Sequence, residues 1–273
     1  SKSGLIWLNQ DKLYFEDALA PAQQTSSGYP RVVRGWTRGK VASTAPVVFE
    51  GQPEDVSVHA MVLRDGDVDH VFFSRALTFF TERLYYDKNG TLELLALPED
   101  ISVQSVYQGQ LLFKNRSQLG AIPSGSLVSV DLEALIKGQG VFTAVFTPSA
   151  TQALKGVSRS RSYLFLSVLD QVRSKVIRIE RKLGSGVAEW EAQEMPLPGS
   201  GTVNLVSVDE DSDRLLMTYE DFLVPSSLYA VDGKDLSRSL VQQVPPRFDA
   251  KGLVIDQHFV RSKDGTQIPY FIV

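Results

Sequence analysis

Short runs of apolar and β-branched residues recur from one end of the chain to the other, separated by glycine, proline, asparagine or aspartate. Helical periodicity is nearly missing, so the pattern predicts an all-β protein. Five stretches each hold four such runs, and a unit of about 50 residues with four strands is typical of a β-propeller blade. The five stretches are Leu5–Glu50, Val56–Leu95, Ile101–Phe146, Ala153–Met195 and Val203–Pro245.

The second run of several stretches is apolar on both faces, as in Val71-Phe72-Phe73 and in the segment from Tyr163 to Val168. A strand with one face in water alternates between apolar and polar residues, whereas a strand covered on both faces does not. The pattern therefore favours sheets stacked face to face, as propeller blades are. Asn89-Gly90 predicts a tight hairpin turn, and Leu132 to Lys137 is the only stretch expected to be helical.

A boundary is expected after Pro245-Pro246, where the four-strand pattern stops. We predict a partial β-propeller domain over residues 1–247. Residues 248–273 are predicted to be a linker and a C-terminal hairpin, formed by Val254–Arg261 and Gln267–Val273. The final apolar run, Tyr270 to Val273, is of the kind that needs a partner sheet, so the hairpin is expected to lead into a missing domain.

Composition narrows the possible classes of protein and partner. Hydrophobic residues make up 43% of the 273-residue chain and charged residues 22%, values typical of a globular protein. The formal charge of −4, with no block of lysine and arginine, favours neither nucleic acid nor an anionic membrane as a partner. Cysteine is absent, which excludes disulfides and suits the cytoplasm, with the periplasm as an alternative.

Candidate catalytic residues are few. A serine hydrolase of the α/β type needs a Gly-x-Ser-x-Gly elbow, and none occurs. Gly184-Ser185-Gly186 and Gly199-Ser200-Gly201 come closest, but turns explain them better. The three histidines are His59, His70 and His258; the first two could face each other across a hairpin, yet no spacing typical of a metal site accompanies them. We therefore predict no catalytic, cofactor-binding or metal-binding residue in this chain.

Three further clusters have a structural and a functional interpretation. Asp209 to Asp213 has the acid density of a calcium loop but lacks its glycine and terminal glutamate, so an acidic hairpin tip is expected. Gly28 to Gly39 holds three arginines and two aromatic residues, which could grip a carboxylate; we favour a structural role in tying one blade to the next. Phe79-Phe80 and Tyr85-Tyr86 are expected to pack between blades.

Several segments together resemble the propeller region of the prolyl oligopeptidase family of serine peptidases. The resemblance covers nearly the whole chain and is most specific in the last segment, which is similar to the hairpin that links the propeller to the α/β-hydrolase domain in that family. The segments are Ser27-Gly28-Tyr29-Pro30-Arg31, Trp36-Thr37-Arg38-Gly39, Gly125-Ser126-Leu127-Val128, Phe222-Leu223-Val224-Pro225-Ser226-Ser227-Leu228-Tyr229 and Ser262-Lys263-Asp264-Gly265-Thr266-Gln267-Ile268-Pro269.

The resemblance implies a seven-bladed propeller that caps a serine peptidase acting on short, often proline-containing peptides. Here only five blade-sized units are expected, and the catalytic triad would belong to the absent hydrolase domain. We therefore expect a non-catalytic gating domain that is inactive alone and needs no cofactor. Its expected partners are the hydrolase domain, short peptides through the parent enzyme, and a second copy through exposed blade faces.

Two other functions remain open at this point. The chain could be a self-standing propeller that binds peptides or glycans, which would require a finished C-terminus. It could also be a five-bladed glycosidase or metal-dependent hydrolase, although those enzymes bring carboxylates or histidines together at the central channel. No such constellation is visible in the sequence.

Overall fold

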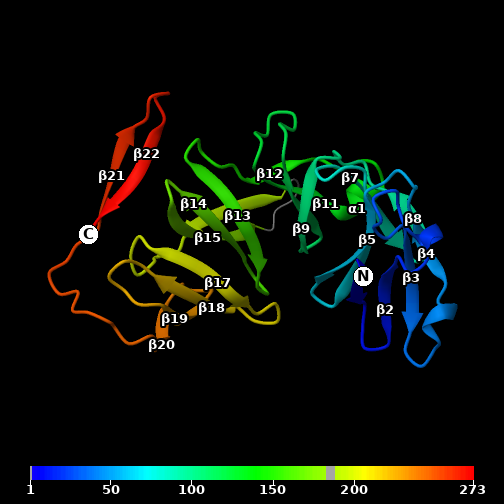
Figure 1. Cartoon of the computed structure of the whole chain (residues 1–273), viewed down its shortest axis with the longest axis horizontal. Helices are drawn as coiled ribbons and strands as arrows, with labels where there is room; N and C mark the ends of the chain where they lie inside the picture. Colours follow the sequence, from blue (N-terminus) through cyan, green and yellow to red (C-terminus); the bar gives the residue numbers. More distant parts are fainter. Residues whose placement is uncertain (1, 183–187) are drawn as a thin grey trace. The chain divides into compact units, whose positions relative to one another are not determined.

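Consecutive strands pair as antiparallel neighbours to form five four-stranded sheets and one two-stranded hairpin (Figure 1). The computed structural model describes residues 2–182 and 188–273. The chain divides into two compact units, Ser1–Phe146 and Thr147–Val273. The first unit holds three of the sheets, and the second holds two sheets and the hairpin.

Each sheet of the first unit is built from four strands in chain order. The bounds agree with the predicted runs to within a few residues, because the turn residues between the runs end the strands. The first sheet is β1(Leu5–Trp7), β2(Lys12–Asp17), β3(Val32–Thr37) and β4(Val47–Glu50); the second is β5(Ser57–Asp65), β6(Val68–Ala76), β7(Glu82–Lys88) and β8(Thr91–Leu94); the third is β9(Ile101–Tyr107), β10(Gln110–Asn115), β11(Leu127–Asp131) and β12(Thr143–Phe146).

The second unit repeats the same plan twice and then ends in the predicted hairpin. The fourth sheet is β13(Gln152–Arg159), β14(Leu164–Asp170), β15(Arg173–Lys182) and β16(Glu189–Glu194); the fifth is β17(Thr202–Val208), β18(Arg214–Glu220), β19(Ser227–Asp232) and β20(Arg238–Gln243); the hairpin is β21(Asp256–Arg261) and β22(Gln267–Ile272). The all-β architecture of stacked four-stranded antiparallel sheets with a terminal hairpin is thereby confirmed.

Helix is confined to short pieces among the described residues. The predicted helix is α1(Leu132–Ile136), which begins where the Asp131 side chain accepts a hydrogen bond from the Ala134 N–H at 2.9 Å. Two short 3-10 helices, η1(Pro21–Gln23) and η2(Ala42–Thr44), lie in loops of the first sheet and were not expected from the sequence. None of the described helices has the length and hydropathy to cross a bilayer.

Strand β6 shows why the sheets stack. Phe72 packs with the third sheet's residues in one apolar cluster, while its neighbours Val71 and Phe73 pack with the first sheet in another. Phe72 and Phe73 are 0% and 1% exposed, so the strand is covered on both faces, as its unbroken apolar run predicts. In the second unit, Phe165 of the fourth sheet packs in the same way against residues of the fifth.

The two aromatic pairs differ from each other, and one expectation is wrong. Tyr85 packs as predicted, with its ring 5.2 Å from that of Phe49 in the first sheet. Phe79 and Phe80, however, are 78% and 68% exposed. They lie in the β6–β7 turn, where the Thr78 and Thr81 side chains bond to each other at 2.7 Å and the Arg116 guanidinium lies over the Phe80 ring.

Several hairpin turns adopt the left-handed backbone, and two of them do so with different kinds of residue. Asn89 and Gly90 have φ values of 54° and 89°, which these residue types accept at low cost. In the β14–β15 turn the same conformation falls on Gln171 and Val172, with φ values of 48° and 61°. Since Val172 is β-branched, its positive φ stores strain.

We expect Val172→Gly to stabilise the second unit by about 1 kcal/mol, because glycine removes the strain at positive φ and loses part of that gain to its larger unfolded-state entropy. Urea unfolding followed by circular dichroism measures the change. Gly90→Val, which places the same side chain at positive φ, is the matched reverse substitution and should destabilise the first unit. A destabilised Val172→Gly variant would contradict the strain argument.

Candidate functional site

Polar side chains gather where the chain passes from the first sheet to the second. Residues 51–56 make this crossing, and the loop between β2 and β3 packs on them. The Thr25 hydroxyl donates to the Val56 carbonyl at 2.9 Å, and the Ser26 N–H donates to the Pro53 carbonyl at 2.8 Å. We call the loop 24–31, residues 50–58 and Arg75 the first junction.

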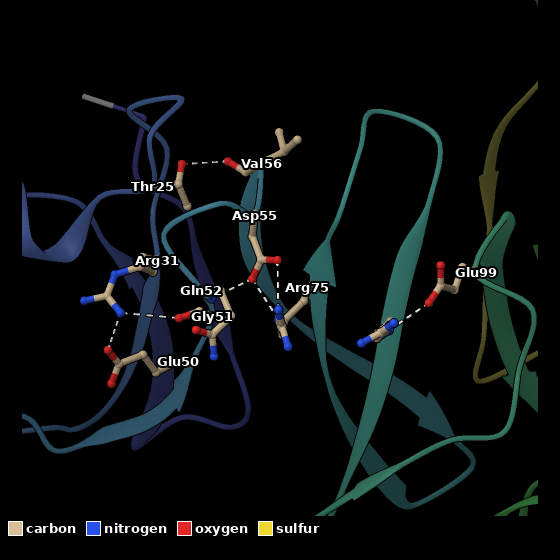
Figure 2. Close-up of polar contacts among 10 residues, drawn as sticks. Thr25, Arg31, Glu50, Gly51, Gln52, Asp55, Val56, Arg75 and Glu99 are labelled. Carbon is tan, nitrogen blue, oxygen red and sulfur yellow. Dashed lines mark hydrogen bonds and ion pairs between the residues drawn. The ribbon is translucent and has the colours of Figure 1, made fainter.

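Asp55 is the centre of the first junction (Figure 2). Its carboxylate, 3% exposed, accepts two hydrogen bonds from the Arg75 guanidinium, from Nε at 2.7 Å and from Nη2 at 3.0 Å. The Gln52 N–H donates a third at 2.7 Å. A planar guanidinium and a carboxylate paired in this way fix each other's orientation. The crossing segment is thereby tied to the end of strand β6.

Gly51 and Arg31 complete the turn around Asp55. A Cβ on Gly51 would lie 2.7 Å from the Asp55 carboxylate, so glycine is required for this close approach. The Arg31 guanidinium pairs with Glu50 and donates to the Gly51 carbonyl at 3.3 Å (Figure 2). It also donates to the Ala22 carbonyl at 2.6 Å. Arg31 therefore ties the loop to strand β4 and to the start of the crossing.

The ionisation of the central pair follows from these contacts. Burial opposes ionisation of the Asp55 carboxyl, but the hydrogen bonds from Arg75 and from the Gln52 N–H outweigh burial and lower its pKa. The same hydrogen bond raises the pKa of Arg75. Both groups therefore stay charged across the physiological range, and neither is free to exchange a proton with a substrate.

A second polar line joins strand β5 to strand β2. The Ser57 Oγ lies 2.7 Å from His59 Nε2, and His59 Nδ1 lies 3.0 Å from a Glu16 carboxylate oxygen. This is the order of groups in a Ser-His-acid charge relay. Sequence analysis missed it, since Glu16 is 43 residues away from His59; the Ser-x-His spacing on one strand face was the only signal available.

The burial of Ser57 argues against a nucleophile. Ser57 is 3% exposed, so a peptide carbonyl cannot reach its Oγ while the first two sheets are packed together. The hydrogen bond with Glu16 raises the pKa of His59 against the opposing effect of burial, and the charge of Glu82 adds to the rise. The contact is thus an ionic link between the first two sheets.

The remaining histidines take no part in a common site. His59 is opposite Ser74 in the sheet and His70 is opposite Leu63, so the two rings do not face each other across the hairpin. His70 bonds to the Tyr86 hydroxyl at 3.1 Å, and His258 stacks on Tyr270. Among residues 2–182 and 188–273, no group of three or more histidine or acidic side chains is placed to hold a metal ion.

The serine–glycine segments also take structural places where they are described. Gly199-Ser200-Gly201 forms the turn between β16 and β17, and the Gly201 N–H donates to the Tyr219 hydroxyl at 3.2 Å. Gly184-Ser185-Gly186 lies outside the described residues. The prediction that this chain carries no catalytic, cofactor-binding or metal-binding residue stays a prediction.

Two arginines of the segment, Arg34 and Arg38, link strands within the first sheet, which differs from the expected tie between blades, whereas the Pro30 carbonyl of the same segment accepts a hydrogen bond from the Val58 N–H of β5 at 3.0 Å. Arg34 pairs with Asp17 at 2.7 Å and donates to the Ala45 carbonyl at 2.8 Å. Arg38 donates to the Gln10 carbonyl at 2.8 Å. These partners all belong to the first sheet or its loops, because short hairpins bring them closer than any neighbouring sheet.

The acidic segment is a hairpin tip between β17 and β18, as predicted, but it is less solvated than expected. Asp213 is 7% exposed and accepts hydrogen bonds from the Ser160 hydroxyl at 2.8 Å and the Ser162 N–H at 2.9 Å. Glu210 pairs with Arg159 of the fourth sheet. The tip therefore fixes the fourth and fifth sheets to each other.

Asp55→Asn should destabilise the first unit by about 3 kcal/mol, because the neutral amide leaves the partly buried Arg75 charge without its counter-ion. Urea unfolding followed by the fluorescence of Trp7 and Trp36 reports the change in the first sheet. Glu99→Gln is the matched control: its ion pair with Arg83 is about half exposed and should contribute less than about 1 kcal/mol. Equal losses in both variants would refute the special role of Asp55.

The His59–Glu16 link should weaken in alkali. Since the folded-state pKa of His59 is raised, its contribution is fully present below the unfolded pKa of about 6.5 and is lost as the pH rises through the folded value. The stability difference between the native chain and His59→Gln should therefore shrink from pH 5.5 to pH 8.5. Burial lowers the pKa of His70, so His70→Gln should show the opposite trend. A pH-independent difference for His59→Gln would disprove the link.

Comparison with known proteins places this architecture in a family. The model of the prolyl oligopeptidase N-terminal β-propeller domain matches residues 1–244. An uncharacterized peptidase of Sinorhizobium fredii, y4nA, is 32% identical over all of this chain. The chain spans 39% of the length of that relative.

Solved structures agree with the sequence match. A post-proline cleaving enzyme from Rickettsia typhi is similar over 98% of this chain and 40% of its own, with a TM-score of 0.85 and 25% identity. Oligopeptidase B from Leishmania major shares the fold over 97% of this chain and 37% of its own, with a TM-score of 0.71 and 17% identity. Because the family model covers all five four-stranded sheets, the chain belongs to the prolyl oligopeptidase family and comprises its β-propeller region.

Proposed function

We propose that this chain is the gating and substrate-admitting domain of a serine oligopeptidase that acts on short, often proline-containing peptides. The observation that carries the proposal is the family match over residues 1–244, which includes all five four-stranded sheets. The relatives are peptidases, and one similar structure is that of a post-proline cleaving enzyme. The catalytic groups are proposed to belong to a hydrolase domain outside this chain.

The packing between sheets suits such a gate. Apolar contacts such as those of Phe72 and Phe73 are not directional, so adjacent sheets can shift relative to each other at a modest cost in free energy. A few polar links, such as Asp55–Arg75 and His59–Glu16, then decide how far each pair of sheets opens. A peptide would pass when these links yield, and a folded protein would be excluded.

The domain plan is part of the proposal. We propose residues 1–247 as the propeller region and residues 248–273 as the linker and hairpin that lead into the hydrolase domain. The family model ends at residue 244, and β21 and β22 form a sheet of their own. Leu240 and Val241 on β20 are about half exposed, which supports self-association through uncovered sheet surfaces.

The pure chain should neither hydrolyse a proline-containing peptide p-nitroanilide nor be labelled by a fluorophosphonate serine probe. Absorbance and intact mass measure the two outcomes, and native mass spectrometry of the same sample reports dimers if sheet surfaces associate. Turnover or labelling would contradict the prediction that this chain is not catalytic. Ser57→Ala serves as the control, because loss of a label in this variant would assign reactivity to the Ser57–His59–Glu16 line.

Locking the first two sheets together should slow peptide entry. We expect Glu16→Cys with His59→Cys to form the chain's single disulfide, since the native chain has no cysteine. In a fusion of this chain to the hydrolase domain of the Sinorhizobium fredii relative, the oxidised form should hydrolyse the peptide several-fold more slowly, and dithiothreitol should restore the rate. Each single cysteine variant is the control. An oxidised form that keeps the full rate would contradict gating by movement of the first two sheets.

A further inference from the structure

A cavity of about 450 Å³ lies in the second unit, where the fifth sheet meets the terminal hairpin. Its walls come from the β14–β15 turn, from the ends of β17 and β18, and from the hairpin. We call it the hinge pocket and define it by Val172, Thr202, Glu220, Phe222 and Phe271. The Phe222 and Phe271 rings lie 5.7 Å apart, so they join the sheet and the hairpin across the pocket.

The floor of the hinge pocket is a rigid hydrogen-bonded network. Tyr219 is fully buried; its hydroxyl donates to the Asp221 carboxylate and accepts from the Gly201 N–H. The other Asp221 oxygen accepts from the Leu223 and Val224 N–H groups at 2.8 and 2.6 Å. Gly201 leaves no room for a Cβ against the Glu220 carbonyl. The pocket is therefore held open by bonded groups and requires no rearrangement to accept a ligand.

The charge and polarity of the walls select a class of ligand. Among the described lining residues there are two acids and no base, and half of the residues are apolar. The Asp221 carboxylate already accepts hydrogen bonds within the network at the bottom of the pocket, whereas Glu220 is exposed at the end of β18. A pocket lined by an acidic residue and two phenylalanine rings is complementary to an organic cation, through ion pairing and cation–π attraction.

The strained turn forms one rim of the hinge pocket. Val172, with its φ of 61°, lines the cavity, and the preceding Gln171 carbonyl accepts a hydrogen bond from Gln257 of the hairpin at 2.8 Å. Strained backbone tends to persist where it serves a site. The hairpin thus contacts the β14–β15 turn through Gln257 and lines the pocket through Phe271, which is opposite Gln257 in the hairpin. A ligand that fills the cavity touches the propeller sheet and the hairpin at once.

We propose that the hinge pocket binds a protonated amine carried on an apolar body, with the ammonium group at Glu220 and the apolar body against the Phe222 and Phe271 rings. The amino terminus of a peptide and a free small amine share this chemistry. Binding fixes the hairpin against the fifth sheet. This site concerns residues of the second unit alone, so it does not depend on the gating role proposed for the sheets of the first.

The test is a titration of the complete 273-residue chain at pH 6.5, observed by amide chemical shifts. The probes are phenylalaninamide and the peptide amide Phe-Gly-Gly, each compared with its N-acetyl form, which keeps the apolar body and removes the charge. We expect dissociation constants of about 1 mM for the free amines and at least tenfold weaker binding of the acetylated forms. A tighter complex with the peptide assigns the amino terminus as the source, and a tighter complex with phenylalaninamide assigns a free amine.

Variants locate the site. Glu220→Gln keeps the side-chain shape and should weaken binding about fivefold, while Glu189→Gln on the neighbouring β16 strand is the matched control and should leave binding unchanged. Shifted amides should map to the β14–β15 turn, residues 200–202 and 220–226, and the start of the hairpin. Equal binding of free and acetylated probes, equal effects of the two variants, or shifts confined to other regions would overturn the proposal.

Discussion

The need to cover both faces of each sheet governs this structure. A strand such as β6 carries apolar side chains on its two faces, with Phe72 and Phe73 pointing in opposite directions. One four-stranded sheet cannot bury both sets of side chains by itself, so each sheet needs neighbours on either side. Burial of apolar surface provides the attraction between sheets, and the repetition of that attraction produces the stack within each unit.

Polar contacts at the ends of the strands fix how neighbouring sheets are positioned, which apolar packing alone does not do. Asp55 pairs with Arg75 at the first junction, and the Asp65 carboxylate accepts hydrogen bonds from the Gln108 and Gly109 N–H groups of the third sheet. In the second unit, Asp213 serves the same purpose for the Ser160–Ser162 turn. These carboxylates lie at or beside turns, where they accept hydrogen bonds from backbone N–H groups that have no partner in the sheets.

The sequence correctly predicted the features that depend on residues close together in the chain. Turn residues ended nearly every run within a few positions of the observed strand ends, and Asp131 capped the one predicted helix. It was less informative for contacts between distant segments. Phe79 and Phe80 were expected between blades because they are aromatic, yet both are exposed in the turn that contains the hydrogen bond between Thr78 and Thr81. Similarly, Arg34 binds Asp17 and the Ala45 carbonyl of its own sheet, because the short connections of that sheet bring them close to it.

By itself, the sequence determined the repeated four-strand units, the two-sided burial of the inner strands and the resemblance to a peptidase propeller, because alternation and turn chemistry act over a few residues. The tertiary structure alone decided which carboxylate meets which cation. Glu16 reaches His59 and Asp55 meets Arg75 because sheet packing brings separate segments together, and Glu220 lines the same pocket as Phe222 and Phe271 because the hairpin folds back on the fifth sheet. Local pattern can specify a strand, whereas a site made by side chains from several strands depends on how those strands pack.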